Sequence, residues 1–128
     1  MSVRAIAKGV RMSPRKVGIV AALIRGRTVE DALVILKHTP RRSAEVVTKV
    51  LASAKANAEH NHNLKPDTLK ITEITVTPGQ QLKRYRPAAR GRALPFVRRS
   101  CHISVVVDGE VRVAKKVAKV ETDKPEAR

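Results

Sequence analysis

The stretch LKITEITVTPGQQLKRYRPAARGRALPFVRRSCHISVVVD, residues 69–108, decides the fold. It begins and ends with strand-like runs, 69–77 and 101–107, which are rich in β-branched residues. Between them lie prolines, glycines and basic residues without helical periodicity. The two runs and their connection predict a long β-hairpin that continues out of a sheet, with its apex near residues 87–91.

The predicted hairpin carries only positive charge. No acidic residue occurs between Glu73 and Asp108, and the only two aromatic residues of the chain, Tyr85 and Phe96, both lie in this segment. Such a segment is a poor hydrophobic core and is typical of a surface that binds a polyanion. A disordered loop is the alternative, and we expect the tip to become ordered only on binding. The basic residues of the segment are Lys83, Arg84, Arg86, Arg90, Arg92, Arg98 and Arg99.

The length, net charge and hydrophobic content of the chain are typical of one folded, strongly basic domain. The chain has 128 residues, a net charge of +16 and 42% hydrophobic residues. We expect a domain over residues 1–110, including the hairpin at about 78–99, and a basic, disordered tail over residues 111–128. No apolar run is long enough to cross a membrane, the first residues lack an apolar signal sequence, and the single cysteine fits a reducing compartment. We therefore expect a cytoplasmic protein without a membrane partner.

The rest of the chain predicts one strand and three helices. Residues 2–10 alternate as a short strand, and the pair Ser13–Pro14 marks a helix start. Thr28 caps a second helix, which has acidic residues in its first turn. The pair Thr39–Pro40 opens the longest helix, about residues 41–60, and small apolar residues recur along one face of that helix.

Three local features refine the strands. The apolar positions slip between Ile71 and Ile74, which indicates a β-bulge. Cys101 falls on the apolar side of its strand and is expected in the core. The pair Asp108–Gly109 is typical of a hairpin turn, across which Val111 could pair back.

A second cationic region occupies the first 29 residues, which contain no acidic residue. Arg15 and Lys16 fall in the first turn of the first predicted helix, where the helix dipole disfavours cations. Backbone N–H groups and cations at a helix start together favour phosphate binding. Solvated surface charge is the alternative for any single residue. Together with the hairpin, this region predicts contact with nucleic acid.

Other functional classes have weaker support. A DNA-compacting protein could insert a basic β-arm into a minor groove, but dimer-forming apolar helices would favour it, and the helix faces here suit one monomer core. His60 and His62 have no further ligand at zinc spacing, so no metal is expected. The serines lack a histidine and carboxylate context, and no glycine-rich phosphate loop occurs. We therefore expect neither an enzyme nor a cofactor.

An ordered set of motifs resembles one family. The chain closely resembles the bacterial member of the ribosomal large-subunit protein twenty-two family over residues 2–108. Two local features differ from the family's usual sequence: Leu82 stands where methionine is common, and the stretch 94–96 is less polar than its counterpart in the family. The motifs are SPRKV (13–17), IRGR (24–27), ALVIL (32–36), NAEHN (57–61), LKR (82–84), RGRA (90–93) and SCHISVVV (100–107).

The resemblance implies an α+β fold, with three helices packed on a small antiparallel sheet and one long projecting hairpin. It also implies a structural constituent of the large ribosomal subunit that binds large-subunit ribosomal RNA and aids subunit assembly. The hairpin would line the exit tunnel of the nascent polypeptide. The implied partners are this RNA, neighbouring large-subunit ribosomal proteins and the nascent polypeptide, without homo-oligomer formation.

The charge pattern and the resemblance together predict the RNA-binding residues, and the resemblance alone implies the tunnel-lining tip. The expected RNA-binding residues are Arg11, Arg15, Lys16, Arg25, Arg27, Lys83, Arg84, Tyr85, Arg86, Arg90, Arg92, Arg98 and Arg99. The expected tunnel-lining tip consists of Lys83, Arg84, Pro87, Ala88, Ala89, Arg90 and Gly91.

Overall fold

The computed structural model describes residues 2–112 and has the predicted α+β fold. Three helices and three strands follow the order that the sequence predicts, and the first strand has the predicted bounds. The elements are β1 (Ser2–Val10), α1 (Pro14–Ile24), α2 (Val29–His38), α3 (Arg42–His62), the 3₁₀ turn η1 (Pro66–Thr68), β2 (Lys70–Pro87), the 3₁₀ turn η2 (Ala89–Gly91) and β3 (Ala93–Asp108).

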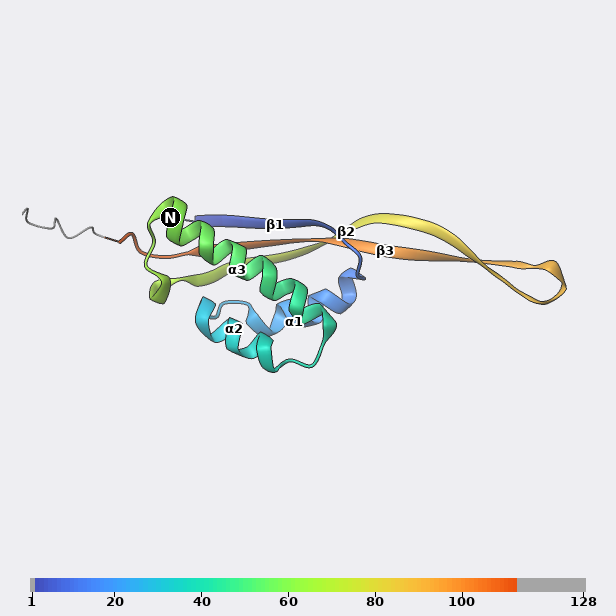
Figure 1. The fold of residues 1–128 in the computed structure, drawn as a ribbon, viewed down its shortest axis with the longest axis horizontal. Coiled ribbons are helices and arrows are strands. Elements are labelled where there is room, and N and C mark those ends of the chain that lie inside the picture. Colours follow the sequence, from blue (N-terminus) through green and yellow to red (C-terminus); the bar gives the residue numbers. More distant parts are fainter. Residues whose placement is uncertain (1, 113–128) are drawn as a thin grey trace, which may run out of the picture.

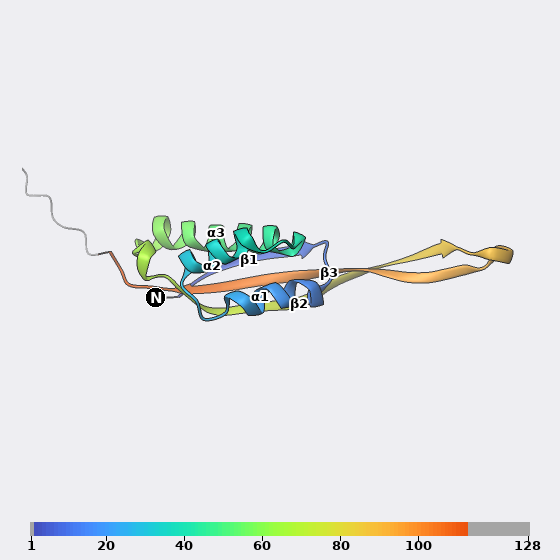
Figure 2. The same ribbon diagram turned by 90° about the horizontal axis from the view of Figure 1, so that it is seen from below.

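The strands form one antiparallel sheet in the order β1-β3-β2, so the last strand in the sequence is the central one. The helices lie together on one face of this sheet (Figures 1 and 2). Helix α3 packs over β1 and β3, whereas α1 packs beside β2. Within the described residues, no helix covers the opposite face.

The core lies between the sheet and the helix layer. Alternate residues of β1 and β3 point into it, among them Val3, Ala5, Ile103 and Val105, as the period of a strand requires. Cys101 is fully buried, which confirms its predicted place in the core, and this burial raises the pKa of its thiol. Helix α3 contributes a stripe of mostly small side chains, which lets its backbone approach the sheet closely. The buried residues of α3 are Ser43, Ala44, Val47, Val50, Leu51, Ala54 and Ala58.

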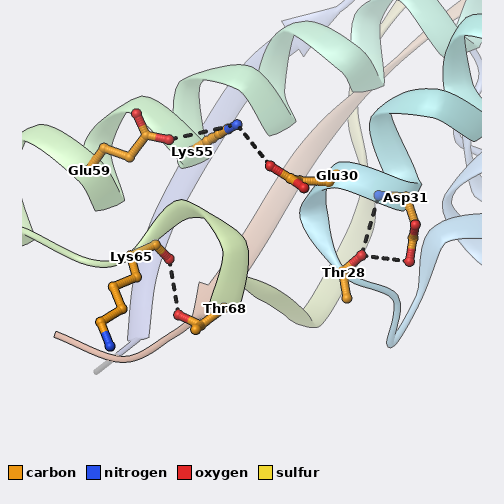
Figure 3. A network of polar contacts seen from close by, with 7 residues as sticks. All are labelled: Thr28, Glu30, Asp31, Lys55, Glu59, Lys65 and Thr68. Carbon is orange, nitrogen blue, oxygen red and sulfur yellow. Dashed lines mark hydrogen bonds and ion pairs between the residues drawn. The ribbon is translucent and has the colours of Figure 1, made fainter. Parts of the chain in front are cut away.

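Helix α2 begins as predicted and is tied to α3 by an ion-pair network (Figure 3). The hydroxyl oxygen of Thr28 accepts a hydrogen bond from the backbone N–H of Asp31 at 3.3 Å. The Lys55 ammonium lies 3.8 Å from a carboxylate oxygen of Glu30 and 3.8 Å from one of Glu59. In the turn that follows α3, the Thr68 hydroxyl donates to a backbone carbonyl (Figure 3). These partly exposed pairs each contribute at most about 1 kcal/mol.

The pair Thr39–Pro40 ends α2 rather than opening α3, so the predicted cap of α3 was wrong. A residue before proline is driven out of the helical region, and Thr39 has an extended backbone. Its hydroxyl donates to the carbonyl oxygen of Ile35 at 2.8 Å and so caps the end of α2. The residue at the start of α3 is instead Arg41, whose side chain makes no capping hydrogen bond.

Strands β2 and β3 continue beyond β1 as a two-stranded arm (Figure 1). The arm comprises residues 81–99 and contains seven residue pairs, from Gln81↔Arg99 to Pro87↔Ala93. At about 3.3 Å per residue these pairs span about 20 Å. The structure confirms the hairpin and its predicted apex, because η2 closes the arm there.

Two bulges shape β2 along this path. The first lies between Ile71 and Glu73, where the sequence predicts a slip in the apolar pattern. The second lies between Pro78 and Gln81 at the base of the arm. There Gly79 passes so close to β3 that an added Cβ would lie 2.8 Å from the Ser100 hydroxyl oxygen. A side chain would not fit at this position without a shift of its neighbours.

The hairpin predicted at Asp108–Gly109 does not form. Asp108 already pairs with β1 on one side and β2 on the other, so β3 has no free edge for a returning strand. Val111 instead forms a bridge with Leu64, after α3. Most of the tail predicted for residues 111–128, from 113 onward, lies outside the described residues. Among the described helices, none is long and apolar enough to span a membrane.

Candidate nucleic-acid interface

The arm has two different faces. Directly paired residues in an antiparallel ladder project to the same side, and successive residues alternate between sides. One side, here called the arginine face, carries three guanidinium groups, each opposite an apolar residue. Its pairs are Leu82↔Arg98, Arg84↔Phe96 and Arg86↔Leu94, and those of the other face are Gln81↔Arg99, Lys83↔Val97, Tyr85↔Pro95 and Pro87↔Ala93.

Large apolar side chains are exposed along the arm. Tyr85 is 74% exposed and Phe96 is 38% exposed, and Leu94 and Val97 also face solvent. The Arg98 guanidinium lies over the Phe96 ring, 6.0 Å from its centroid. Exposed apolar groups interleaved with cations are typical of a surface that binds a partner, because they contribute nothing to the core.

The tip of the arm is a tight turn with two residues in the left-handed region. Arg90 has φ of 59° and Gly91 has φ of 68°, and the N–H of Ala88 donates to the Arg92 carbonyl at 2.8 Å. The part of the predicted tip set from Pro87 to Gly91 lies at this turn. Lys83 and Arg84 of that set lie lower on the arm and on opposite faces of it.

A second group of cations surrounds a cleft of about 1130 Å³ at the base of the arm. Three segments that are distant in the sequence meet here: the start of α1, the start of α3 and the base of the arm. All the residues that line this arm-base cleft belong to the described part of the chain, and none of them is acidic. Its basic residues are Arg11, Lys16, Arg41, Arg42, Arg98, Arg99 and the imidazole of His102.

The structure separates the predicted cations of the first 29 residues. Arg11 and Lys16 line the cleft, whereas Arg15 is exposed and does not line it. Arg25 and Arg27 lie beyond the far end of α1, where their guanidinium groups donate to backbone carbonyls: Arg25 to Ile74 at 3.5 Å and Arg27 to Leu23 at 3.0 Å. Cations at a helix C-terminus stabilise the helix, so these two residues contribute to the fold, and their contact with RNA stays a prediction.

Sequence reasoning missed Arg41 and Arg42. Their signal was present, because two adjacent cations stand at the start of the longest helix, where the dipole disfavours them. The misplaced cap at Thr39–Pro40 hid this signal.

Cations of the arm and the cleft lack acidic partners within residues 2–112. The ion pairs there join Lys55 with Glu30 and Glu59, and Lys65 with Glu110, all away from the arm. The described residues also contain no cluster of three potential metal ligands. The surface therefore offers uncompensated positive charge, exposed apolar groups and no site for metal chemistry in this part of the chain.

Fold and surface together define a class: a basic α+β protein that carries a cationic two-stranded arm. The sequence model of the family described as "Ribosomal protein L22p/L17e" matches residues 5–108. The chain belongs to this family of ribosomal proteins, which confirms the resemblance read from its motifs.

Individual relatives match over nearly their whole length. The chain is 52% identical to "Large ribosomal subunit protein uL22" of Clostridium novyi (strain NT) over 107 residues, which cover 84% of this chain and 96% of the relative. It is 48% identical to the protein of the same name from Herpetosiphon aurantiacus over 112 residues, 87% of this chain and 99% of the relative.

Proposed function

We propose that this protein is a structural constituent of the large ribosomal subunit that holds ribosomal RNA with its arm and performs no catalysis. One observation carries the proposal: a two-stranded arm projects from the domain with seven cations and no acidic residue between 74 and 107. The relatives' name supports the location in the large subunit. The partners are large-subunit ribosomal RNA and neighbouring proteins of that subunit.

The arginine face suits folded RNA. Guanidinium groups bind phosphate in a bidentate manner, and the apolar residues beside them can pack on sugars and bases. Tyr85 projects from the opposite face, where its exposed ring can stack on an unpaired base. Because both faces of the arm carry binding groups, the arm is suited to insertion between RNA segments rather than to lying on a duplex. An arm that contacts several segments at once would aid subunit assembly.

The tip is suited to line the exit tunnel of the nascent polypeptide. Pro87, Ala88 and Ala89 have small side chains without hydrogen-bonding groups and Gly91 has none, so a passing chain would find few side-chain groups that retain it. Arg90 would add positive charge at the same place, with Lys83 and Arg84 lower on the arm. The protein acts here as a single copy. Most apolar residues of its helices are buried in its own core, and Ile19, Leu23 and Val34 are the large apolar residues of the described helices that stay exposed.

Sedimentation in a high-salt sucrose gradient tests this function. The tagged protein is expected to remain with large-subunit particles, because many buried phosphate contacts hold it there. Replacement of Lys83, Arg84 and Arg86 by alanine should weaken binding to large-subunit RNA and reduce the salt slope by about 2, while helix content stays unchanged. A matched control replaces three exposed lysines away from the arm, Lys37→Ala, Lys49→Ala and Lys70→Ala.

Release of the wild-type protein into a free or DNA-bound pool at moderate salt would contradict the proposal. An equal loss of RNA binding in the control would show that bulk charge, rather than the arm, determines affinity. A comparable loss of thermal stability in the arm variant would assign these three cations to the fold instead.

A further inference from the structure

The starts of α1 and α3 differ from the start of α2. Helix α2 has a side-chain cap and two acidic residues in its first turn, the arrangement that a helix dipole favours. Neither α1 nor α3 has a capping hydrogen bond from its N-cap side chain. Both of these helices begin at the arm-base cleft, whereas α2 begins beside the bridge Thr28↔Lys70 at the opposite end of β2. Helix α1 has no acidic residue in its first turn, and α3 has one, Glu45. At the start of α3, a residue with a side-chain oxygen would stabilise the helix more than Arg41 does.

Donors without acceptors gather at the start of α3. The backbone N–H groups of Arg42 and Ser43 have no acceptor among the described residues, because the Arg41 side chain cannot accept and the Arg41 carbonyl accepts from Ala44 instead, at 2.9 Å. Ser43 is 5% exposed, lines the cleft, and its hydroxyl makes no hydrogen bond within residues 2–112. Among the described residues, every fully enclosed side-chain oxygen has a hydrogen-bond partner. Because the Ser43 hydroxyl has no partner, it is not fully enclosed, and it opens to the cleft that Ser43 lines.

Cations complete the site around these donors. Arg41 and Arg42 come from the N-cap and first residue of α3, Lys16 from the first turn of α1, and Arg98 and Arg99 from the base of the arm. Like charges held around one cavity repel each other, so an anion that neutralises them would stabilise their arrangement. Two backbone N–H groups, a hydroxyl and guanidinium groups are the donors that bind a phosphate ester.

We infer that the arm-base cleft binds the phosphate backbone of a ribosomal RNA strand, as a contact separate from the arm tip. This inference rests on the proposed function and adds a second binding site to it. The N–H groups of Arg42 and Ser43 and the Ser43 hydroxyl hold one phosphate, and the surrounding cations neutralise its neighbours. A cleft of about 1130 Å³ exceeds the roughly 300–1,000 Å³ of small-molecule pockets and holds a short turn of a single strand.

The substitution Arg41→Asp separates binding from stability. Aspartate is a favoured N-cap and would accept a hydrogen bond from the first turn of α3, so the thermal midpoint should stay unchanged or rise. The same carboxylate would repel phosphate, and affinity for large-subunit ribosomal RNA should fall about tenfold or more. The matched control is Lys49→Glu, an exposed position in the middle of α3 with the same change of charge. It should weaken binding far less.

The outcomes distinguish the inference from the proposed function. If the wild-type protein binds no large-subunit RNA, the proposed function itself fails. If the wild type binds but Arg41→Asp and Lys49→Glu lose equal affinity, only the cleft is overturned.

A second measurement identifies the source of the phosphate. Amide resonances of Arg42 and Ser43 should shift when a short single-stranded oligoribonucleotide is added to the full chain at low salt. A response to inorganic phosphate without a response to the oligonucleotide would make the cleft a free-anion site and overturn the RNA assignment. A double variant, Arg41→Ala with Arg42→Ala, should abolish the response to the oligonucleotide. An unchanged response in that variant would also overturn the inference.

Discussion

Cys101 shows how a single residue of the central strand couples stability to pH. Its thiol is fully buried, and desolvation raises its pKa above the value of 9.0 that an exposed thiol has. In the folded state the thiol therefore stays protonated at a pH where the unfolded chain has lost this proton. Because the unfolded state then binds fewer protons, the free energy of unfolding decreases as the pH rises.

We expect wild-type protein to lose stability above about pH 9, with this group contributing up to about 1.4 kcal/mol per pH unit. The variant Cys101→Ala should lack this contribution, although it is less stable at neutral pH because it loses a buried side chain. Thermal unfolding between pH 7 and pH 10 measures the difference. If stability fell with pH in the same way for the two proteins, the thiol would not be the cause of the loss above about pH 9.

Two glycines of the α1 region should respond in opposite ways to the same substitution. Gly18 lies inside the helix and Gly26 follows it with φ of 74°, and an added Cβ would meet no atom within 4 Å at either position. Gly18→Ala should therefore stabilise the protein by about 0.5–1 kcal/mol through helix propensity. Gly26→Ala should destabilise it by about 1–2 kcal/mol because of its left-handed backbone. Urea unfolding measures the free energy of unfolding of both variants, and changes of the same sign in the two would contradict this interpretation.

At the scale of elements, the arm differs from the sheet that it extends. The sheet rests on a helix layer, whereas the arm has only its own cross-strand pairs and exposed apolar groups. A two-stranded hairpin without a covering layer is marginally stable in water. The same ladder therefore gives high local stability near the sheet and low local stability toward the tip.

This difference predicts that the tip folds on binding. In the free protein, amide hydrogens of residues 82–94 should exchange much faster than those of residues 101–107, because the former lack a helix layer. Binding to large-subunit ribosomal RNA should slow exchange in the tip and leave the central strand unchanged. Hydrogen exchange followed by NMR or mass spectrometry provides the measurement. Full protection of the tip in the free protein would contradict the prediction.

At the scale of the whole molecule, ion pairs and uncompensated cations occupy different places. Within residues 2–112 the ion pairs join Lys55 with Glu30 and Glu59, and Lys65 with Glu110, whereas no acidic residue occurs in the arm or lines the cleft. A charge distribution of this kind orients the approach to a polyanion and raises the rate of productive encounter. The arm would therefore meet RNA first, before the domain docks.

Local patterns predicted most of the elements, and long-range pairing explains what they missed. The alternation of β1, the cap at Thr28 and the slip after Ile71 each depend on neighbours in the sequence, and each was confirmed. The hairpin at Asp108–Gly109 failed because β3 is the central strand, which no local pattern encodes. The cleft is assembled from three distant segments, so Arg41 and Arg42 gained their significance only in the folded chain.

The central position of β3 also fixes the order in which the protein can complete its fold during translation. Strand β1 is made first, but its partner β3 ends at residue 108. At about 5–20 residues per second, β1 waits on the order of 5–20 s for that partner to be synthesised. Until then β1 and the start of β2 are unpaired edges, and the helices have no closed sheet to cover. The domain therefore closes only after nearly all of its basic residues have been made and can already meet RNA.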